Sequence, residues 1–445
     1  MRWVPLIAAV LLAGCAHYAQ VPLESDPGVL ASPVASVLAR EAAAIRRPFL
    51  TPTTIDLAAP LDPNAIATLA VIANPDLKAQ RVRAGVSDAQ LFAARLLPDP
   101  TLSVGASKVV SGPDPLIDLA NALGLDIQAL RTRGVRIAAA RAQAGQVRLD
   151  LAWAEWQTAG QARLQAARTQ GLERRAALAA ASRDAARSLA DRTLRAAGRG
   201  DLPPDQVQAA RLSAFNAAEL VRTAERDLAA ARFELTRLIG LPPSYPLTLA
   251  PVAAPPPPPD AAVLFAFARD TRSDLAALRE GYAAQEATVH RAVLEQFPTL
   301  ALTINANRDS AGNALVGPAI DFTLPLWNRN RGGIAVERAT REALKTEYDA
   351  RLFQTRAEIA AAVGGIAVAH RQRVAALHDL PAVQQFAVAS RRAANRGDLA
   401  PATAEIAEQA LRDNQTLVAQ ADQDIAEQTI ALELLTGAPR EDWPQ

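Results

Sequence analysis

The 445-residue sequence is poor in the residues on which most enzymes and nucleic-acid-binding proteins depend. It has one cysteine, so no disulfide can form within the chain. Its 47 basic and 46 acidic residues leave a net charge of +1, which gives no broad attraction to nucleic acid. Of four histidines, His370 and His378 are closest, but they lack the i, i+4 spacing of a chelating pair. We find no phosphate loop or nucleophile elbow, and expect no enzyme activity, no metal site and no cofactor.

Aromatic residues make up only 4% of the chain, whereas alanine is abundant throughout. This composition favours long, closely packed helices over a large globular enzyme core. No apolar run after residue 14 has the length expected of a transmembrane helix.

The first 14 residues have the pattern of a secretory signal peptide: a basic start, a short apolar run and two small residues. The sequence Leu12-Ala13-Gly14-Cys15 resembles a bacterial lipobox, after which Cys15 becomes the lipidated first residue of the mature protein. The alternative is an ordinary signal peptide followed by an incidental cysteine. If the lipobox is real, Ala16 in place of an aspartate favours the outer membrane.

The rest of the chain divides into two repeats. AAGRGDLPP at Ala196–Pro204 recurs as AANRGDLAP at Ala393–Pro401, and Asn74-Pro75-Asp76-Leu77 matches Arg272-Ser273-Asp274-Leu275. Duplication over this length predicts two copies of one structural unit. We therefore expect these segments: signal peptide 1–14, extended lipid-anchored segment 15–60, first repeat 61–240, Pro-rich linker 241–260, second repeat 261–437 and tail 438–445.

Each repeat predicts three helices. Asp62 or Asn64 would cap the first, which ends near Leu97. Helices of about 65 residues precede the two RGD turns and would reach about 100 Å, too long for a compact domain. Helices after the turns carry a seam that steps by three and four, apolar throughout in the first copy and including Asn414 and Gln428 in the second, which predicts coiled-coil packing in a tall hairpin or tube. The expected ranges are 62–97, 133–197, 204–239, 261–296, 331–394 and 400–436.

Between the first and second helices of each repeat the sequence alternates like two strands, each of about ten residues with one apolar and one polar face. This pattern is typical of a transmembrane β-barrel, or of a soluble hairpin packed on the helices. Four strands cannot close a barrel, so a barrel would have to be shared by several chains. The apolar positions are Leu102, Val104, Ala106, Leu123, Leu125, Ile127, Leu300, Leu302, Ile304, Ile320, Phe322, Leu324 and Leu326.

This order of elements, over nearly all of residues 60–438, resembles the TolC-like bacterial outer-membrane efflux proteins. The resemblance implies a mainly α fold with a small β part, in a homotrimer with a shared 12-stranded barrel and a periplasmic helical tunnel. It implies a passive outer-membrane channel that works with a periplasmic adaptor protein and an inner-membrane pump, in a Gram-negative bacterium. A periplasmic coiled-coil scaffold lipoprotein is the alternative from another class.

The second strand-to-helix junction adds a hint about cargo. Leu324-Pro325-Leu326-Trp327-Asn328-Arg329-Asn330-Arg331-Gly332 resembles the junction of outer-membrane components of heavy-metal cation (RND-type) exporters. Its marked residues are Pro325, Trp327, Asn328, Arg329 and Asn330. Drug efflux and type I protein secretion remain alternatives for the same channel.

The resemblance also places the two RGD turns at the periplasmic tip. The residues implied to contact the adaptor are Arg199, Gly200, Asp201, Leu202, Arg396, Gly397, Asp398 and Leu399. We expect both glycines to reverse the chain, and Asp201 and Asp398 to cap the following helices. Together with Glu405 these carboxylates could favour cations at the entrance. The acidic gate positions of some relatives are not acidic in this chain: Gln206, Ala209, Thr403 and Ile406.

Overall fold

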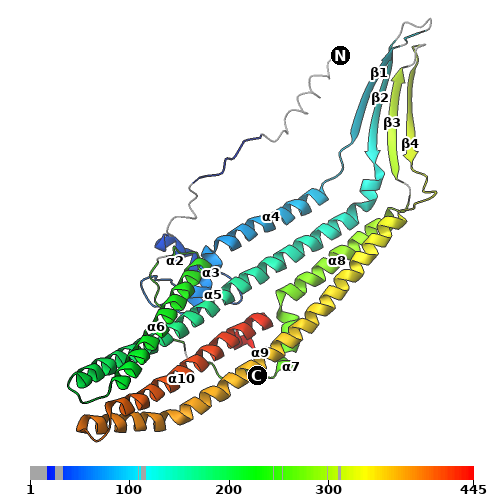
Figure 1. Ribbon diagram of the computed structural model, residues 1–445. Coiled ribbons are helices and arrows are strands. Elements are labelled where there is room, and N and C mark those ends of the chain that lie inside the picture. Colours follow the sequence, from blue (N-terminus) through cyan, green and yellow to red (C-terminus); the bar gives the residue numbers. More distant parts are fainter. Residues whose placement is uncertain are drawn as a thin grey trace.

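The computed structural model describes residues 18–25, 34–108, 110–111, 117–243, 245–252, 254–297, 299–308 and 312–444. The expected signal peptide and Cys15 lie outside these ranges. A four-stranded sheet lies at one end of a long helical body, and two helical hairpin turns lie at the other (Figure 1). The elements are α2 (Ala35–Ala44), α3 (Pro63–Ala73), α4 (Pro75–Arg95), β1 (Thr101–Lys108), β2 (Ile117–Asp126), α5 (Ile127–Gly198), α6 (Pro204–Leu238), α7 (Ala261–Thr271), α8 (Ser273–Leu294), β3 (Leu300–Arg308), β4 (Ala314–Phe322), α9 (Arg331–Arg396), α10 (Pro401–Thr436) and a 3-10 turn, η2 (Arg440–Asp442).

The expected duplication is visible in this order, because two helices, two strands, a long helix and a shorter helix occur twice. The first expected helix of each repeat is divided in two. Residues before proline disfavour the helical conformation, and Asn74, before Pro75, has ψ 122° and ends α3. The Asn74 carboxamide then caps α4 by accepting the Leu77 N–H at 3.0 Å. Of the two predicted caps for α3, Asp62 accepts the Ala65 N–H at 2.7 Å.

The N-terminal segment, which we expected to be extended, contains α2 and is fixed to the body. Glu155 on α5 is buried and accepts hydrogen bonds from Arg47 Nη2 at 2.8 Å and from Arg81 Nε at 2.9 Å. Burial alone would raise the pKa of Glu155, but the hydrogen bonds from the two guanidinium groups outweigh it and lower the pKa. This carboxylate therefore joins the N-terminal segment, α4 and α5.

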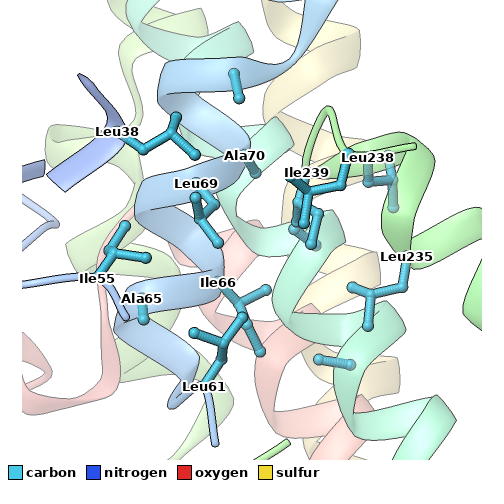
Figure 2. Packing of buried hydrophobic residues seen from close by; sticks show 14 of the residues in the cluster. Leu38, Ile55, Leu61, Ala65, Ile66, Leu69, Ala70, Leu235, Leu238 and Ile239 are labelled. Atoms are coloured by element: carbon cyan, nitrogen blue, oxygen red, sulfur yellow. The ribbon is translucent and has the colours of Figure 1, made fainter. Parts of the chain in front are cut away.

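The main hydrophobic core lies in the middle of the body. Ile66 and Leu69 of α3 pack with Leu235, Leu238 and Ile239 at the end of α6 (Figure 2). Towards the hairpin turns, burial follows the predicted seams, which are largely alanine. The buried seam positions are Val207, Ala210, Ala217, Val221, Ala231, Leu235 and Leu238 on α6, and Ala404, Ala407, Ala421, Ile425 and Leu432 on α10. Small seam residues let the helices of each hairpin approach closely.

The two long helices have 72 residues (α5) and 66 residues (α9). By length and composition alone, α9 contains an 18-residue stretch apolar enough to cross a membrane, contrary to our expectation, and only 22% of that stretch is buried. A 66-residue helix extends for about 99 Å, several times the thickness of a bilayer. Its alanine-rich surface is compatible with packing against another helix.

Candidate functional site: the sheet and the hairpin turns

All four strands form one antiparallel sheet in the order β1-β2-β3-β4. The hairpins of the two repeats join through β2 and β3, where Leu125 pairs with Leu302. Within the described residues, the outer edges of β1 and β4 have no partner strand. Because unpaired backbone groups at a sheet edge bind further strands readily, both edges are suited to pairing with another chain.

The register places the predicted apolar positions within the strands on one face, where Asn121 also lies, whereas Leu315 lies on the other face. Leu102, Leu123, Ile304 and Pro318 form one row across the sheet, and Leu125, Leu302 and Ile320 form the next. The opposite face carries small and polar residues, with Thr101, Gly124, Thr303 and Ala319 in one row and Ser103, Ala122, Asn305 and Gly317 in another. A mainly apolar face opposite a mainly polar face is what a barrel wall between lipid and water requires.

The apolar face is not covered by the helices. Leu102 is 71% exposed and Val316 is 77% exposed. Among the described residues, the sheet contacts the helices only slightly, mainly where β3 meets α5. The sheet projects beyond the helical body, so a hairpin packed on the helices is not what forms (Figure 1).

Two of the predicted strand ends were wrong. Ile127 and Gln128 begin α5, because Asp126 caps this helix by accepting the Ala129 N–H at 2.9 Å. Leu324 and Leu326 follow the end of β4 at Phe322. Alternation of side chains continued past both ends, but a capping residue and a proline-containing turn end the strands there.

The junction after β4 is a left-handed turn at Arg329 and Asn330. These are the non-glycine residues with positive φ in the described chain, at 46° and 52°. The Asn330 carboxamide donates to the Ala292 carbonyl of α8 at 2.8 Å, and Arg329 Nε donates to the Pro325 carbonyl at 3.1 Å. The motif therefore sets the start of α9 against the end of α8, while Trp327 is exposed. In the described residues no group of three or more His, Cys, Asp or Glu side chains is placed to hold a metal ion.

The two RGD turns have nearly identical backbones. Gly200 has φ +83° and Gly397 has φ +82°, as the predicted chain reversals require. The predicted capping role of Asp201 and Asp398 is wrong, because the N-cap residues are Pro203 and Ala400. Neither helix has a side-chain hydrogen bond at its N-cap.

Each aspartate binds the arginine of its own RGD turn instead. Arg199 Nε donates to Asp201 at 2.9 Å, and Arg396 Nε donates to Asp398 at 2.8 Å. Leu202 and Leu399 are half-buried beside these exposed pairs. The charge of each turn is thereby neutralised locally.

Glu405 is also paired. It binds Arg412, and both side chains are 13% exposed. Arg412 lies 3.9 Å from Glu408, which in turn binds Arg391 on α9. We call Arg391, Glu405, Glu408 and Arg412 the α9–α10 clasp. Sequence reasoning missed it, although the i, i+4 spacing of Glu408 and Arg412 on one helix was an available signal.

The sequence matches no known family model and no curated protein. The fold, however, matches several solved structures. One is CusC, a protein that forms a transmembrane channel. Its TM-score is 0.70 and its sequence identity is 14%, and the match covers 85% of this chain and 92% of CusC. VceC, an outer membrane protein of Vibrio cholerae, gives 0.69 at 17% identity over 84% and 96%. The CmeC outer membrane channel of Campylobacter jejuni gives 0.70 at 14% identity over 96% and 94%. The fold is that of a TolC-like outer-membrane channel.

The three solved structures match 84% to 96% of this chain. At these identities the match establishes the arrangement of elements, whereas individual side chains must be judged on this chain's own contacts.

Proposed function

We propose that the chain is the outer-membrane channel subunit of a tripartite efflux system and conducts substrates passively from the periplasm to the exterior. The observation that carries this proposal is the sheet, with its exposed apolar face, its polar opposite face and its two free edges. In water such a surface would aggregate, whereas in a bilayer its apolar face would be solvated by lipid.

Closure of the sheet requires more than one chain. Lipid tolerates no unpaired strand edge, and the smallest membrane barrels have about eight strands. With four strands per chain, three copies give the 12-stranded barrel that the family resemblance implies. In this homotrimer β1 of one copy would pair with β4 of the next.

A lipid anchor at Cys15 is compatible with this arrangement. From Cys15 to Val34 the chain has 34 − 15 = 19 residues, which can span at most about 65 Å. Glu155, which binds Arg47, is 155 − 127 = 28 residues from the sheet end of α5, or about 42 Å. The N-terminal segment is therefore long enough to connect its attachment on α5 with an acyl group in the membrane.

The hairpin turns would lie at the periplasmic end of the tunnel, where they would meet the adaptor protein and, through it, the inner-membrane pump. They lie at the end of the helical body opposite the sheet (Figure 1). Exposed Trp327 would then lie near the membrane interface, a common position for this residue. The junction at Pro325–Asn330 favours a metal-cation exporter over drug efflux or type I secretion.

Membrane extraction separates the channel from a scaffold lipoprotein. The Cys15→Ser variant, exported with a cleavable signal peptide that does not depend on lipidation, should stay in the membrane through carbonate and high-salt washes, because the barrel holds it there. The purified protein should also give discrete conductance in planar bilayers. Release of this variant by carbonate, together with absent conductance, would support the scaffold instead.

Cargo is tested in cells. Deletion of the gene should increase sensitivity to zinc, cobalt, cadmium or copper if the junction motif reflects metal export. Increased sensitivity to drugs alone would favour drug efflux, and loss of a secreted protein would favour type I secretion.

A further inference from the structure

The helical body, like the sheet, has two open edges. Near the hairpin turns, α5 packs on α6 and α10, and α10 packs on α9. Consecutive helices in this layer are thus α6, α5, α10 and α9. Among the described helices α6 makes extensive contact with α5 alone, so α6 and α9 are the two edges of the layer.

Both edge helices expose large apolar side chains. On α6 these are Leu212, Phe215 and Leu220, each more than 60% exposed, and on α9 they include Val374 and Phe386, also more than 60% exposed. Exposed apolar residues that gather on the unpartnered sides of two helices indicate surfaces that are covered in the assembled protein.

Rotational symmetry determines which residues can meet. Both turns lie at the same end of the molecule, and rotation about an axis along the helices does not change a residue's height above that end (Figure 1). Leu212 is 212 − 204 = 8 residues from the start of α6, about 12 Å above the turn. Ala389 is 396 − 389 = 7 residues from the end of α9, about 11 Å above its turn.

At similar heights above the turns, the two edge helices also carry residues of opposite charge. Asp205, in the first turn of α6, and Arg392, four residues before the end of α9, are exposed and have no ion-pair partner among the described residues. Their heights differ by only about 5 Å, within the reach of an arginine side chain. Phe215 and Val388, both exposed, lie about 17 and 12 Å above the two turns.

We infer that α6 of one copy packs antiparallel against α9 of the next copy, with Asp205 facing the partner's Arg392 and Leu212 facing the partner's Ala389. This inference rests on the proposed channel function, since it assumes the same ring of copies that closes the barrel. It adds the residues that close the helical tunnel.

Cysteine cross-linking tests the contact directly, because Cys15 is the only native cysteine. The full-length Leu212→Cys/Ala389→Cys variant, oxidised in membranes, should shift from monomer to covalent dimer and trimer on a non-reducing gel. Within one copy these positions are at opposite edges of the layer, roughly 30 Å apart at about 10 Å per helix, so any cross-link joins two copies. Each single variant controls for chance collisions.

The matched control is Leu212→Cys/Ala375→Cys. Ala375 is exposed on the same helix but about 20 Å further from the turn than Leu212, and it should give no such ladder. Equal cross-linking of both pairs, or none in either, while the unmodified protein still runs as a trimer, overturns the α6–α9 contact and leaves the channel proposal standing. Absence of any oligomer overturns both.

A charge exchange gives a second measurement. Asp205→Arg or Arg392→Asp alone should lower the temperature at which trimers dissociate, and the double variant should restore it. A double variant as weak as the sum of the two single variants would show that these residues do not face each other.

Discussion

The two helical hairpins have the same turn, but the side chains next to the turn differ. In α9–α10, the clasp ties the two helices together about one to two turns above Gly397. The corresponding positions of α5–α6, at an offset of 197, are Leu194, Gln208, Arg211 and Phe215. Leu194 is 45% exposed and Phe215 is 62% exposed.

The duplication therefore preserved the reversal of the chain and the alanine seam, while the surface above the turn diverged. Close to the turn, α9–α10 is held together by ion pairs, whereas α5–α6 has apolar side chains at matching positions; further from its turn, α5–α6 has an ion pair of its own between Glu173 and Arg232. We interpret the tip of α9–α10 as stabilised by ion pairs within its own chain, which the matching positions of α5–α6 do not form among the described residues, although α6 and α9 both expose apolar side chains.

The largest expected effect comes from breaking what the two hairpins share. Gly200→Pro or Gly397→Pro should abolish export while leaving trimers in the membrane. Proline fixes φ near −65° and cannot donate an N–H, but these glycines have φ above +80° and donate to Ala197 and Ala394. Export assays with membrane trimers as the control measure this. Wild-type export from both variants would mean that the turns are not part of the working tip.

The next effect concerns the strands, where the two repeats should behave alike. Leu302→Arg and Phe322→Arg should each cost about 2–4 kcal/mol if the positions lie near the bilayer midplane. Leu125→Arg, on the first repeat beside Leu302, should cost a similar amount. Trimer yield after refolding into vesicles is the measurement.

Matched substitutions on the opposite face sharpen this test. Thr303→Arg and Asp321→Arg should assemble normally and change conductance instead, because they would face the water-filled lumen. If trimer yields are equal for variants of both faces, the assignment of the faces is wrong.

A smaller effect should separate the hairpins. Glu408→Ala removes the central carboxylate of the clasp and should destabilise the α9–α10 tip by about 1–2 kcal/mol, since Arg412 is mostly buried but Arg391 is largely exposed. Hydrogen exchange in the trimer should become faster around residues 391–412. Arg211→Ala, at the corresponding position of α6, should leave exchange around residues 194–215 unchanged. The same response in both hairpins would remove the distinction between them.

The smallest effect concerns ion selectivity. Asp398→Ala with Glu405→Ala leaves Arg396 and Arg412 without their partners and adds two net positive charges per chain at the tip. Cation selectivity in planar bilayers, read from the reversal potential in a salt gradient, should therefore fall. An unchanged reversal potential would mean that the carboxylates serve only to pair the arginines.

Much of the fold could be predicted from local patterns. The repeat predicted the duplicated order of elements, alternation predicted the strands and their faces, and the glycines predicted the positive-φ turns. These patterns depend on residues that are close in sequence, so they can be recognised without knowledge of the fold. The helices broken at Asn74 and Arg272 were missed because the apolar periodicity continues through both breaks.

The sequence by itself determined the elements, their duplication and the two faces of the sheet, because side-chain spacing and backbone preference act over a few residues. Tertiary structure decided which distant charges meet: Glu155 with Arg47 and Arg81, and Arg391 with Glu408. It also decided that the sheet is largely uncovered by the helices, and that Asp201 and Asp398 bind arginines and not helix termini. Such pairings depend on the path of the chain in three dimensions, where a partner that is far away in sequence, or a slightly longer turn, outcompetes the nearest local donor.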